Sequence, residues 1–296
     1  MKAHRVNQIS AGLTGLAALL IVAGLVVVVI DAVLGGWGAL SWRFFTEEPG
    51  DDVSEGGVFP AIYGTVVLTL LMTVAVMPLG VATAIYLHEY APPHSRLARW
   101  ARAAINNLAG VPSIVFGLFG LGFFVQLLGK AVDHVRGGGL HYAQPGLLWA
   151  ALTLALLTLP IVIVTTEEAL RAVPVETRMA SLALGATRAQ TLGRVVLPGA
   201  LPGIMTGAIL ALSRGAGEVA PVLLTGAAYS LPTLPNALSS QFMHLGYHAY
   251  VLSTQAPDVE AARPMMYATV LVLLMLTFAL NLVAIVVRSR ARRGST

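Results

Sequence analysis

The stretch TTEEALRAVPVETRMASLALGATRAQTLGRVVLPGALPG (165–203) separates two long apolar segments and is the most informative part of the chain. A first short helix is expected to end before Pro174, because a residue that precedes proline avoids the α region. A second is expected to end at Gly185, a residue type that favours the position after a helix, and a third at Pro198. A bend at Gly185 predicts a compact helical knob, with a plain helical linker as the alternative. The predicted helices run over 168–172, 176–184 and 186–198.

The composition is that of an integral membrane protein. Of 296 residues, 56% are hydrophobic and only 11% are charged, against about 25% charged residues in soluble domains. Windows of about 20 apolar residues mark spanning helices, and the first is too long for the apolar core of a secretory signal, so we expect it to stay uncleaved. The absence of cysteine excludes disulfides and thiol chemistry. The predicted spans are 12–34, 59–87, 104–128, 146–166, 203–226 and 265–287.

The basic residues are distributed unequally between the two sides of the predicted spans. Thirteen of the 18 Lys and Arg residues fall in the N-terminus, the 88–103 loop, the 167–202 loop and the tail, and four fall on the other side. The positive-inside rule therefore places both termini in the cytoplasm. The acidic stretch TEEPGDDVSEGG (46–57) agrees, since it falls outside. The basic residues serve as topology signals, so nucleic acid is not an expected partner.

Arg214 and Glu218 are two charges inside the fifth predicted span, within LSRGAGEVAP (212–221). At i and i+4 they are expected to share one helix face, near Thr206 and Ser213. Three interpretations compete: a structural ion pair or snorkelling arginine, a proton relay, and an anion contact in a translocation path. Arginine suits the third, because its planar fork binds two oxygens at once and stays charged at any working pH.

Two further groups carry weaker signals. Arg171, at the end of the fourth span, is either an ordinary positive-inside anchor or a substrate or gating contact. His244 and His248 are four residues apart, but a zinc site needs more ligands than two, so interfacial anchoring is the preferred interpretation and no metal site is expected. Neither a catalytic triad spacing nor an inward carboxylate pair is present, so no catalytic residue is proposed.

The loop between the fourth and fifth spans resembles that of inner-membrane permeases of ABC importers, with the pattern E-A-A-x3-G-x9-I-x-L-P. Gly185 is followed by nine residues and then VVLP (195–198), with Val for Ile. Met179 replaces the acidic residue, so the resemblance does not extend to a charge contact there. In that family the loop forms a coupling helix that fits a groove on the ATP-binding subunit. The residues matched to coupling are Ala180, Ser181, Leu182, Gly185, Ala186, Leu197 and Pro198.

The segments NNLAGVPSIVFGLF (106–119) and LPGIMTGAILALSRGAGEVAPVLLTG (201–226) narrow the resemblance to the phosphate branch of these permeases. The resemblance implies an all-α fold of six transmembrane helices in the bacterial plasma (inner) membrane, with Arg214, Glu218 and Arg171 on the substrate pathway. It implies a second permease, two ATP-binding subunits, an external phosphate-binding protein, phosphate and the lipid membrane as partners. The expected units are 1–58 (first helix and acidic loop), 59–287 (permease domain) and 288–296 (basic tail).

ATP hydrolysis is expected on a separate subunit, because neither Lys2 nor Lys130 lies in a P-loop spacing. The chain itself is expected to bind no cofactor. The alternatives are a permease for another oxyanion such as molybdate or sulfate, a proton-coupled secondary transporter, and a membrane-bound enzyme. The spacing from Gly185 to Pro198 disfavours the secondary transporter, and the missing catalytic set disfavours the enzyme.

Overall fold

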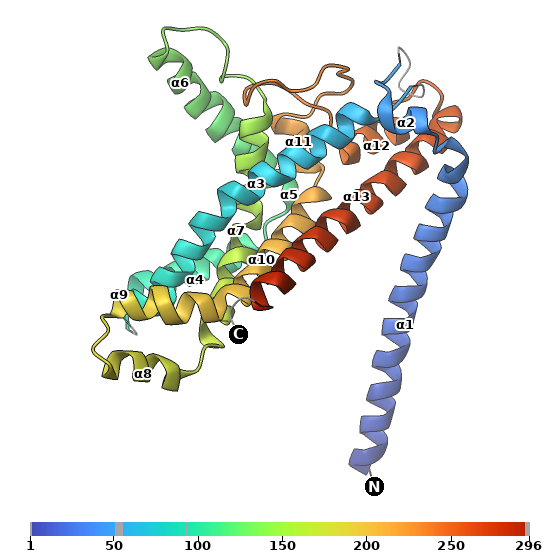
Figure 1. Cartoon of the computed structure of the whole chain (residues 1–296). Helices are drawn as coiled ribbons and strands as arrows, with labels where there is room; N and C mark the ends of the chain where they lie inside the picture. Colours follow the sequence, from blue (N-terminus) through green and yellow to red (C-terminus); the bar gives the residue numbers. More distant parts are fainter. Residues whose placement is uncertain (1, 51–55, 93, 294–296) are drawn as a thin grey trace.

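The computed structural model describes residues 2–50, 56–92 and 94–293, and within them the fold is helical, without β-strands (Figure 1). Part of the predicted acidic stretch (51–55) and the end of the basic tail (294–296) lie outside the described residues. Six helical segments of the described chain are long and apolar enough to span a membrane, as the sequence predicts. They are Ser10–Ala39, Phe59–Tyr90, Ser113–Val135, Leu147–Arg171, Arg188–Ala216 and Val259–Arg290.

The α-helices alternate with short π-helical and 3₁₀ turns. The α-helices are α1 (Lys2–Gly36), α2 (Trp42–Thr46), α3 (Phe59–Ile85), α4 (Arg96–Leu108), α5 (Ser113–Phe119), α6 (Lys130–Val135), α7 (Leu147–Arg171), α8 (Val175–Ala183), α9 (Arg188–Thr191), α10 (Leu197–Ala216), α11 (Ala220–Thr225), α12 (Leu245–Thr254) and α13 (Val259–Arg293). π-Helical turns cover Tyr86–Tyr90, Gly120–Gly129 and Leu192–Val196, and a 3₁₀ turn covers Trp37–Ala39.

The core of the molecule is α7, which packs between α3 and α10. Two thirds of its apolar window, 67%, is buried. Small residues permit close approach of the neighbouring helices: a Cβ on Gly80 of α3 would meet Val162, and one on Gly207 of α10 would meet Thr165. α7 is therefore the fixed element against which the other spanning helices are placed.

α1 is attached to the rest of the molecule at one end only. Its apolar window is 0% buried, and its C-terminal residues Gly35 and Gly36 pack on Tyr267 and Ala268 of α13. The Tyr267 hydroxyl donates to Asp31 at 2.9 Å. Beyond this contact α1 diverges from the other helices (Figure 1), so most of its surface is available to lipid.

The third predicted span begins later than the sequence indicates. Residues 104–108 belong to α4, and the spanning segment starts at Ser113, after Pro112. α4 carries an arginine every third residue, at positions 96, 99 and 102, which makes it amphipathic, so it lies apart from the apolar segment that follows. The end of α4 is apolar and closely precedes the apolar span, so the pattern of apolar residues does not separate the two.

The 165–203 loop differs from its prediction in two ways. The expected helix 168–172 is not separate, since α7 continues to Arg171. Pro198 does not end the following helix, because the π-helical turn Leu192–Val196 precedes it and α10 continues to Ala216. Proline lacks an N–H and clashes with the carbonyl four residues earlier, and a widened π turn relieves such a clash. The predicted bend at Gly185 is confirmed, with φ +85°.

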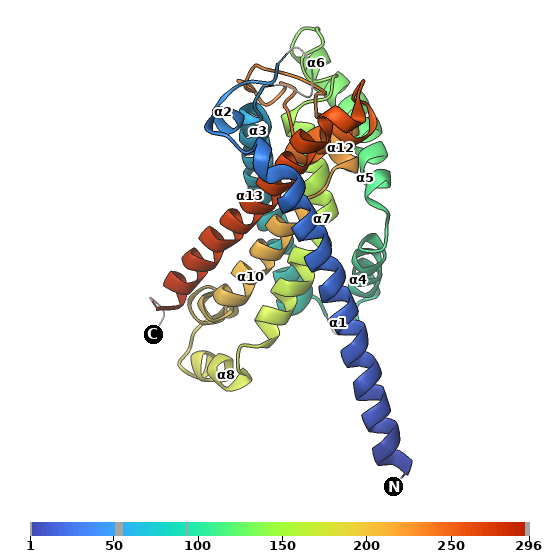
Figure 2. The same ribbon diagram turned by 90° about the vertical axis from the view of Figure 1, so that its right-hand side faces the viewer.

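The two chain ends and the α8 loop lie at the same end of the molecule (Figure 1), and the view turned by 90° agrees (Figure 2). We call this the α8 end, and the opposite end, which carries α12, the α12 end. A chain with six spans returns to its starting side, so this arrangement agrees with the predicted topology.

Candidate translocation site and coupling loop

Arg214 and Glu218 form an ion pair, but not on one helix face as the sequence predicts. Arg214 lies in the last turn of α10, which ends at Ala216, and Glu218 follows in the break before α11. The two Gly residues at 215 and 217 favour this ending, since glycine weakens a helix interior. Arg214 Nε lies 3.4 Å from Glu218 Oε1, and the side chains are 44% and 18% exposed. The guanidinium therefore keeps donors free on an open surface of the chain.

The packing of α10 on α7 fixes the depth of Arg214. Gly203 faces Ala169 and Gly207 faces Thr165, so the helices run antiparallel and Arg214 falls about level with Thr158. Thr158 is near the middle of α7 (Leu147–Arg171). The ion pair consequently lies at mid-height of the spanning region, where a charge is costly and is commonly functional.

Thr206 and Ser213 do not join this pair, although they share its helix. Arg288 of α13 donates to Thr206 Oγ1 at 2.9 Å, and Ser213 donates to Asn281 Oδ1 at 2.5 Å. Both hydroxyls thus bind α10 to α13. Polar side chains that form hydrogen bonds between helices in this way stabilise helix packing within a membrane.

Arg171 is not brought to Arg214. It lies in the last turn of α7, 13 residues from Thr158, which corresponds to roughly 20 Å along a helix axis. Its side chain is exposed, and no hydrogen bond or ion pair reaches it from the described residues. One anion cannot contact both arginines at once, so Arg171 is available only at the α8 end.

The residues matched to coupling fall into two groups. Ala180, Leu182 and Gly185 are exposed on the α8 knob, and Ser181 Oγ lies 2.9 Å from Thr191 Oγ1, which closes the knob on α9. A second group, Leu197 and Pro198, lies in the first turn of α10 rather than on the knob. Ala186, which follows Gly185 in the chain, is half-buried.

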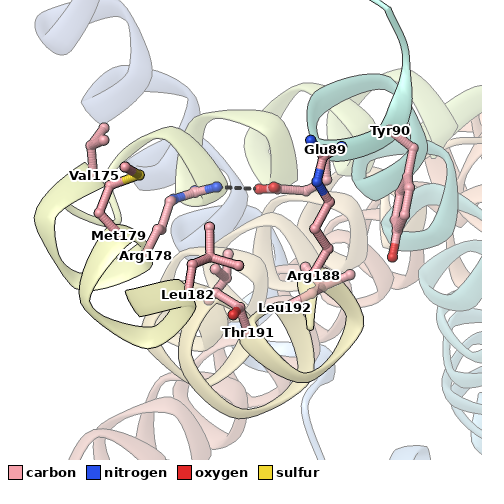
Figure 3. Close-up of a pocket in the computed structure, with 10 residues that line it drawn as sticks. Glu89, Tyr90, Val175, Arg178, Met179, Leu182, Arg188, Thr191 and Leu192 are labelled. Atoms are coloured by element: carbon pink, nitrogen blue, oxygen red, sulfur yellow. Dashed lines mark hydrogen bonds and ion pairs between the residues drawn. The ribbon is translucent and has the colours of Figure 1, made fainter. Parts of the chain in front are cut away.

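A groove of about 310 Å³ separates α8 and α9 from the end of α3 (Figure 3). Arg178 from α8 points across it to Glu89, and Arg188 from α9 flanks it. Leu184, at the tip of the knob, is 90% exposed. Val175, Met179 and Leu182 of α8 are also exposed, at 65%, 61% and 40%. A group of exposed apolar side chains of this kind is suited to docking on another protein.

The described chain matches the family "Binding-protein-dependent transport system inner membrane component" over residues 76–293. The chain belongs to this family. The match includes α7, the α8 loop, α10 and Arg214, whereas α1 lies before it.

Relatives agree with this assignment. "Probable ABC transporter permease protein YqgI" of Bacillus subtilis is 33% identical over 86% of this chain and 86% of its own. "Phosphate transport system permease protein PstA 1" of Mycobacterium tuberculosis is 42% identical over 60% of this chain and 53% of its own. The permease thus spans about half the length of the mycobacterial relative.

Two solved structures share the fold at low sequence identity. The inward-facing MetNI methionine ABC transporter superposes with a TM-score of 0.58 at 21% identity, over 80% of this chain and 94% of that one. A bacterial alginate ABC transporter in complex with its periplasmic protein gives 0.62 at 15% identity, over 92% and 89% of the two chains. These likenesses establish the architecture of the permease.

His244 and His248 of the permease are interior residues, not the interfacial anchors that the sequence favoured. His244 caps α12, accepting from Tyr247 N at 3.4 Å, and both rings are fully enclosed. Desolvation lowers the pKa of each to about 4. Among the described residues no group of three potential metal ligands occurs.

The sequence reasoning missed four charged residues at the α8 end. Arg178 pairs with Glu89, and Arg102 of α4 bonds Glu167 of α7 at 3.2 Å. The partners are 89 and 65 residues apart, so no local pattern connects them. The sequence signal was that Glu89, Arg102 and Glu167 stand beside predicted spans, whereas Arg178 lies within the 167–202 loop.

Proposed function

We propose that the chain is a permease subunit of an ATP-driven importer of inorganic phosphate, with Arg214 as the anion contact. The observation that carries the proposal is an arginine at mid-height of the spanning region whose guanidinium is 44% exposed and held by a single carboxylate. The relatives named as phosphate permeases support the same substrate.

The chemistry of the pair suits transport rather than tight binding. A guanidinium binds two phosphate oxygens through parallel hydrogen bonds, and Glu218 competes for the same donors. Between substrates the carboxylate neutralises the arginine, which reduces the cost of a charge in the membrane. During passage it weakens the grip on phosphate, so that the anion can leave.

The proposed assembly contains a second permease, two ATP-binding subunits and an external phosphate-binding protein. The second permease covers the open surface at Arg214, and the α8 knob docks on an ATP-binding subunit through Leu184 and its neighbours. The α8 end faces the cytoplasm, where the basic loops belong, so both termini are cytoplasmic. ATP is hydrolysed on the partner subunits, and this chain supplies transport without catalysis.

Uptake of labelled phosphate into proteoliposomes that contain the whole complex tests the proposal. We expect uptake to require ATP, to be blocked by vanadate and to survive an uncoupler. Unlabelled phosphate should compete, whereas molybdate and sulfate should not. Competition by molybdate or sulfate at lower concentrations than phosphate would identify that oxyanion as the substrate. Uptake driven by a proton gradient without ATP would refute an ATP-driven importer.

A further inference from the structure

The Arg178 side chain joins α8 to the ends of two spanning helices. Arg178 Nη1 lies 2.5 Å from Glu89 Oε1, and the two side chains are only 17% and 20% exposed. Nη2 of the same guanidinium donates to the carbonyl of Leu170 in the last turn of α7. One side chain of α8 thus contacts both the end of α3 and the end of α7. Figure 3 shows its contact with Glu89.

α8 has little other attachment to the body of the permease. Every residue of α8 is described, and none of its side chains is fully buried. Its other side-chain bond, from Ser181 to Thr191, runs to α9 at the start of the segment that leads into α10. The backbone bends on both sides, at Pro174 and at Gly185, where φ is +85°. A displacement of α8 therefore reaches α3 chiefly through Arg178.

Several side-chain contacts fix the end of α3 that Arg178 meets. It finishes in the π-helical turn Tyr86–Tyr90, whose Leu87 carbonyl accepts from Arg102 Nη2 at 2.6 Å. Arg102 also bonds Glu167 of α7. His88 Nδ1 lies 3.0 Å from Glu89 Oε1, the same oxygen that meets Arg178. The carboxylate that meets Arg178 is consequently fixed in position rather than free to follow it.

α3 leads from this joint to the transport site. Met72 lies 17 residues before Glu89, or roughly 25 Å along the helix, and α3 is helical throughout, Pro78 included. A Cβ on Gly215 would collide with the Met72 sulfur. Gly215 follows Arg214 directly, so α3 touches α10 beside the proposed anion contact. Contacts are continuous from α8 to Arg214.

We propose that the Arg178–Glu89 pair is the joint through which movement of α8 is delivered along α3 to Arg214. Both are positioning residues, since neither touches phosphate. The inference rests on the proposed function, because it assigns to this pair the transmission step of that importer. Coupling through a chain of contacts needs direct evidence, which a measurement of phosphate moved per ATP hydrolysed supplies.

The test uses the complete complex in proteoliposomes, with ATP hydrolysis and phosphate entry measured on the same preparation. Glu89→Gln and Arg178→Gln each should leave assembly and ATP hydrolysis within about twofold of the parent and lower phosphate per ATP by about tenfold. The double variant should be no worse than either single one. Glu260→Gln is the matched control, because it breaks an exposed ion pair within the first turns of α13 and should change nothing.

A second arm protects the test against misfolding. Glu89→Cys with Arg178→Cys creates the only cysteines in the chain. Within this chain a short bis-maleimide, which adds one thiol to each of its two rings, therefore joins these positions alone. Coupling should be lost before cross-linking and recovered after it. Unchanged phosphate per ATP, additive losses, or no recovery would overturn the joint. Absence of phosphate uptake in the parent complex would instead refute the proposed function.

Discussion

The two ends of α10 differ in how they are held, although they belong to one helix. At the α8 end, Gly203 and Gly207 bring the helix into close contact with α7, and Thr206 accepts from Arg288 of α13. At the other end the helix breaks after Ala216, and Arg214 is 44% exposed with Glu218 as its ion-pair partner. α10 is therefore packed on its neighbours along its length, while its last turn presents an accessible charge, so that movement of the helix repositions that charge.

Replacing the charge should have the largest effect. Arg214→Gln is expected to abolish phosphate uptake while the complex still assembles, because glutamine cannot offer a charged fork to the anion. Labelled uptake and co-purification of the subunits measure the two properties. Arg263→Gln, which removes an exposed arginine of α13, is the control. Normal uptake by the Arg214→Gln complex would remove the functional contrast between the two ends.

Removing the competitor should have an intermediate effect. In Glu218→Gln the guanidinium loses its ionic partner, so phosphate should bind more tightly and leave more slowly. We expect maximal uptake to fall by about tenfold with a lower apparent KM, a pattern that separates substrate release from simple damage. Concentration-dependent uptake measures both. An unchanged KM with reduced maximal rate would mean that Glu218 only stabilises the fold.

Disturbing the contact of α10 with α7 should lower the free energy of unfolding. A Cβ on Gly207 would overlap Thr165 Oγ1, so Gly207→Ala should destabilise the chain by about 2 kcal/mol through overpacking. Gly122 is the matched site, because a Cβ there would meet nothing within 4 Å among the described residues, and Gly122→Ala should be neutral. Thermal unfolding of the purified complex in detergent compares them. Equal unfolding temperatures would show that α10 is not tightly packed on α7 at Gly207.

The smallest expected effect concerns the support of the helix break. Val219 packs on Gly246 at the start of α12, beside two histidines whose pKa values are lowered from 6.5 to about 4. The unfolded chain binds more protons between these values, so stability is complete above pH 6.5 and falls as the pH drops towards 4. We expect a loss of about 1 kcal/mol per ring between pH 7.5 and 5.5.

Thermal unfolding at those two pH values, with His248→Leu as the comparison, measures this slope. The variant should be less sensitive to pH than the parent, because it lacks one of the two buried rings. An equal slope in both proteins would show that the pH dependence does not come from the buried His248 ring.

Sequence reasoning succeeded where the physical signal is local. Apolar runs identified six spans, although the third and fifth were predicted as 104–128 and 203–226 and are Ser113–Val135 and Arg188–Ala216. The Arg214–Glu218 pair was visible because its members are four residues apart. It failed where the outcome depends on packing. The helix continues through Pro198 because a π-helical turn makes room for the proline, and nothing in composition announces that turn. The charges at 89 and 178 meet only once α3 and α8 are folded.

The attachment of α1 has a consequence for the response of the molecule to bilayer thickness. α1 joins the bundle through Gly35, Gly36 and Asp31 at one end, and its apolar window is otherwise unburied. A helix mismatched to its bilayer tilts, and α1 can tilt about this single attachment without carrying α7 or α10 with it. Thinner or thicker membranes would therefore change the angle of the first helix and leave the depth of the central arginine unaltered.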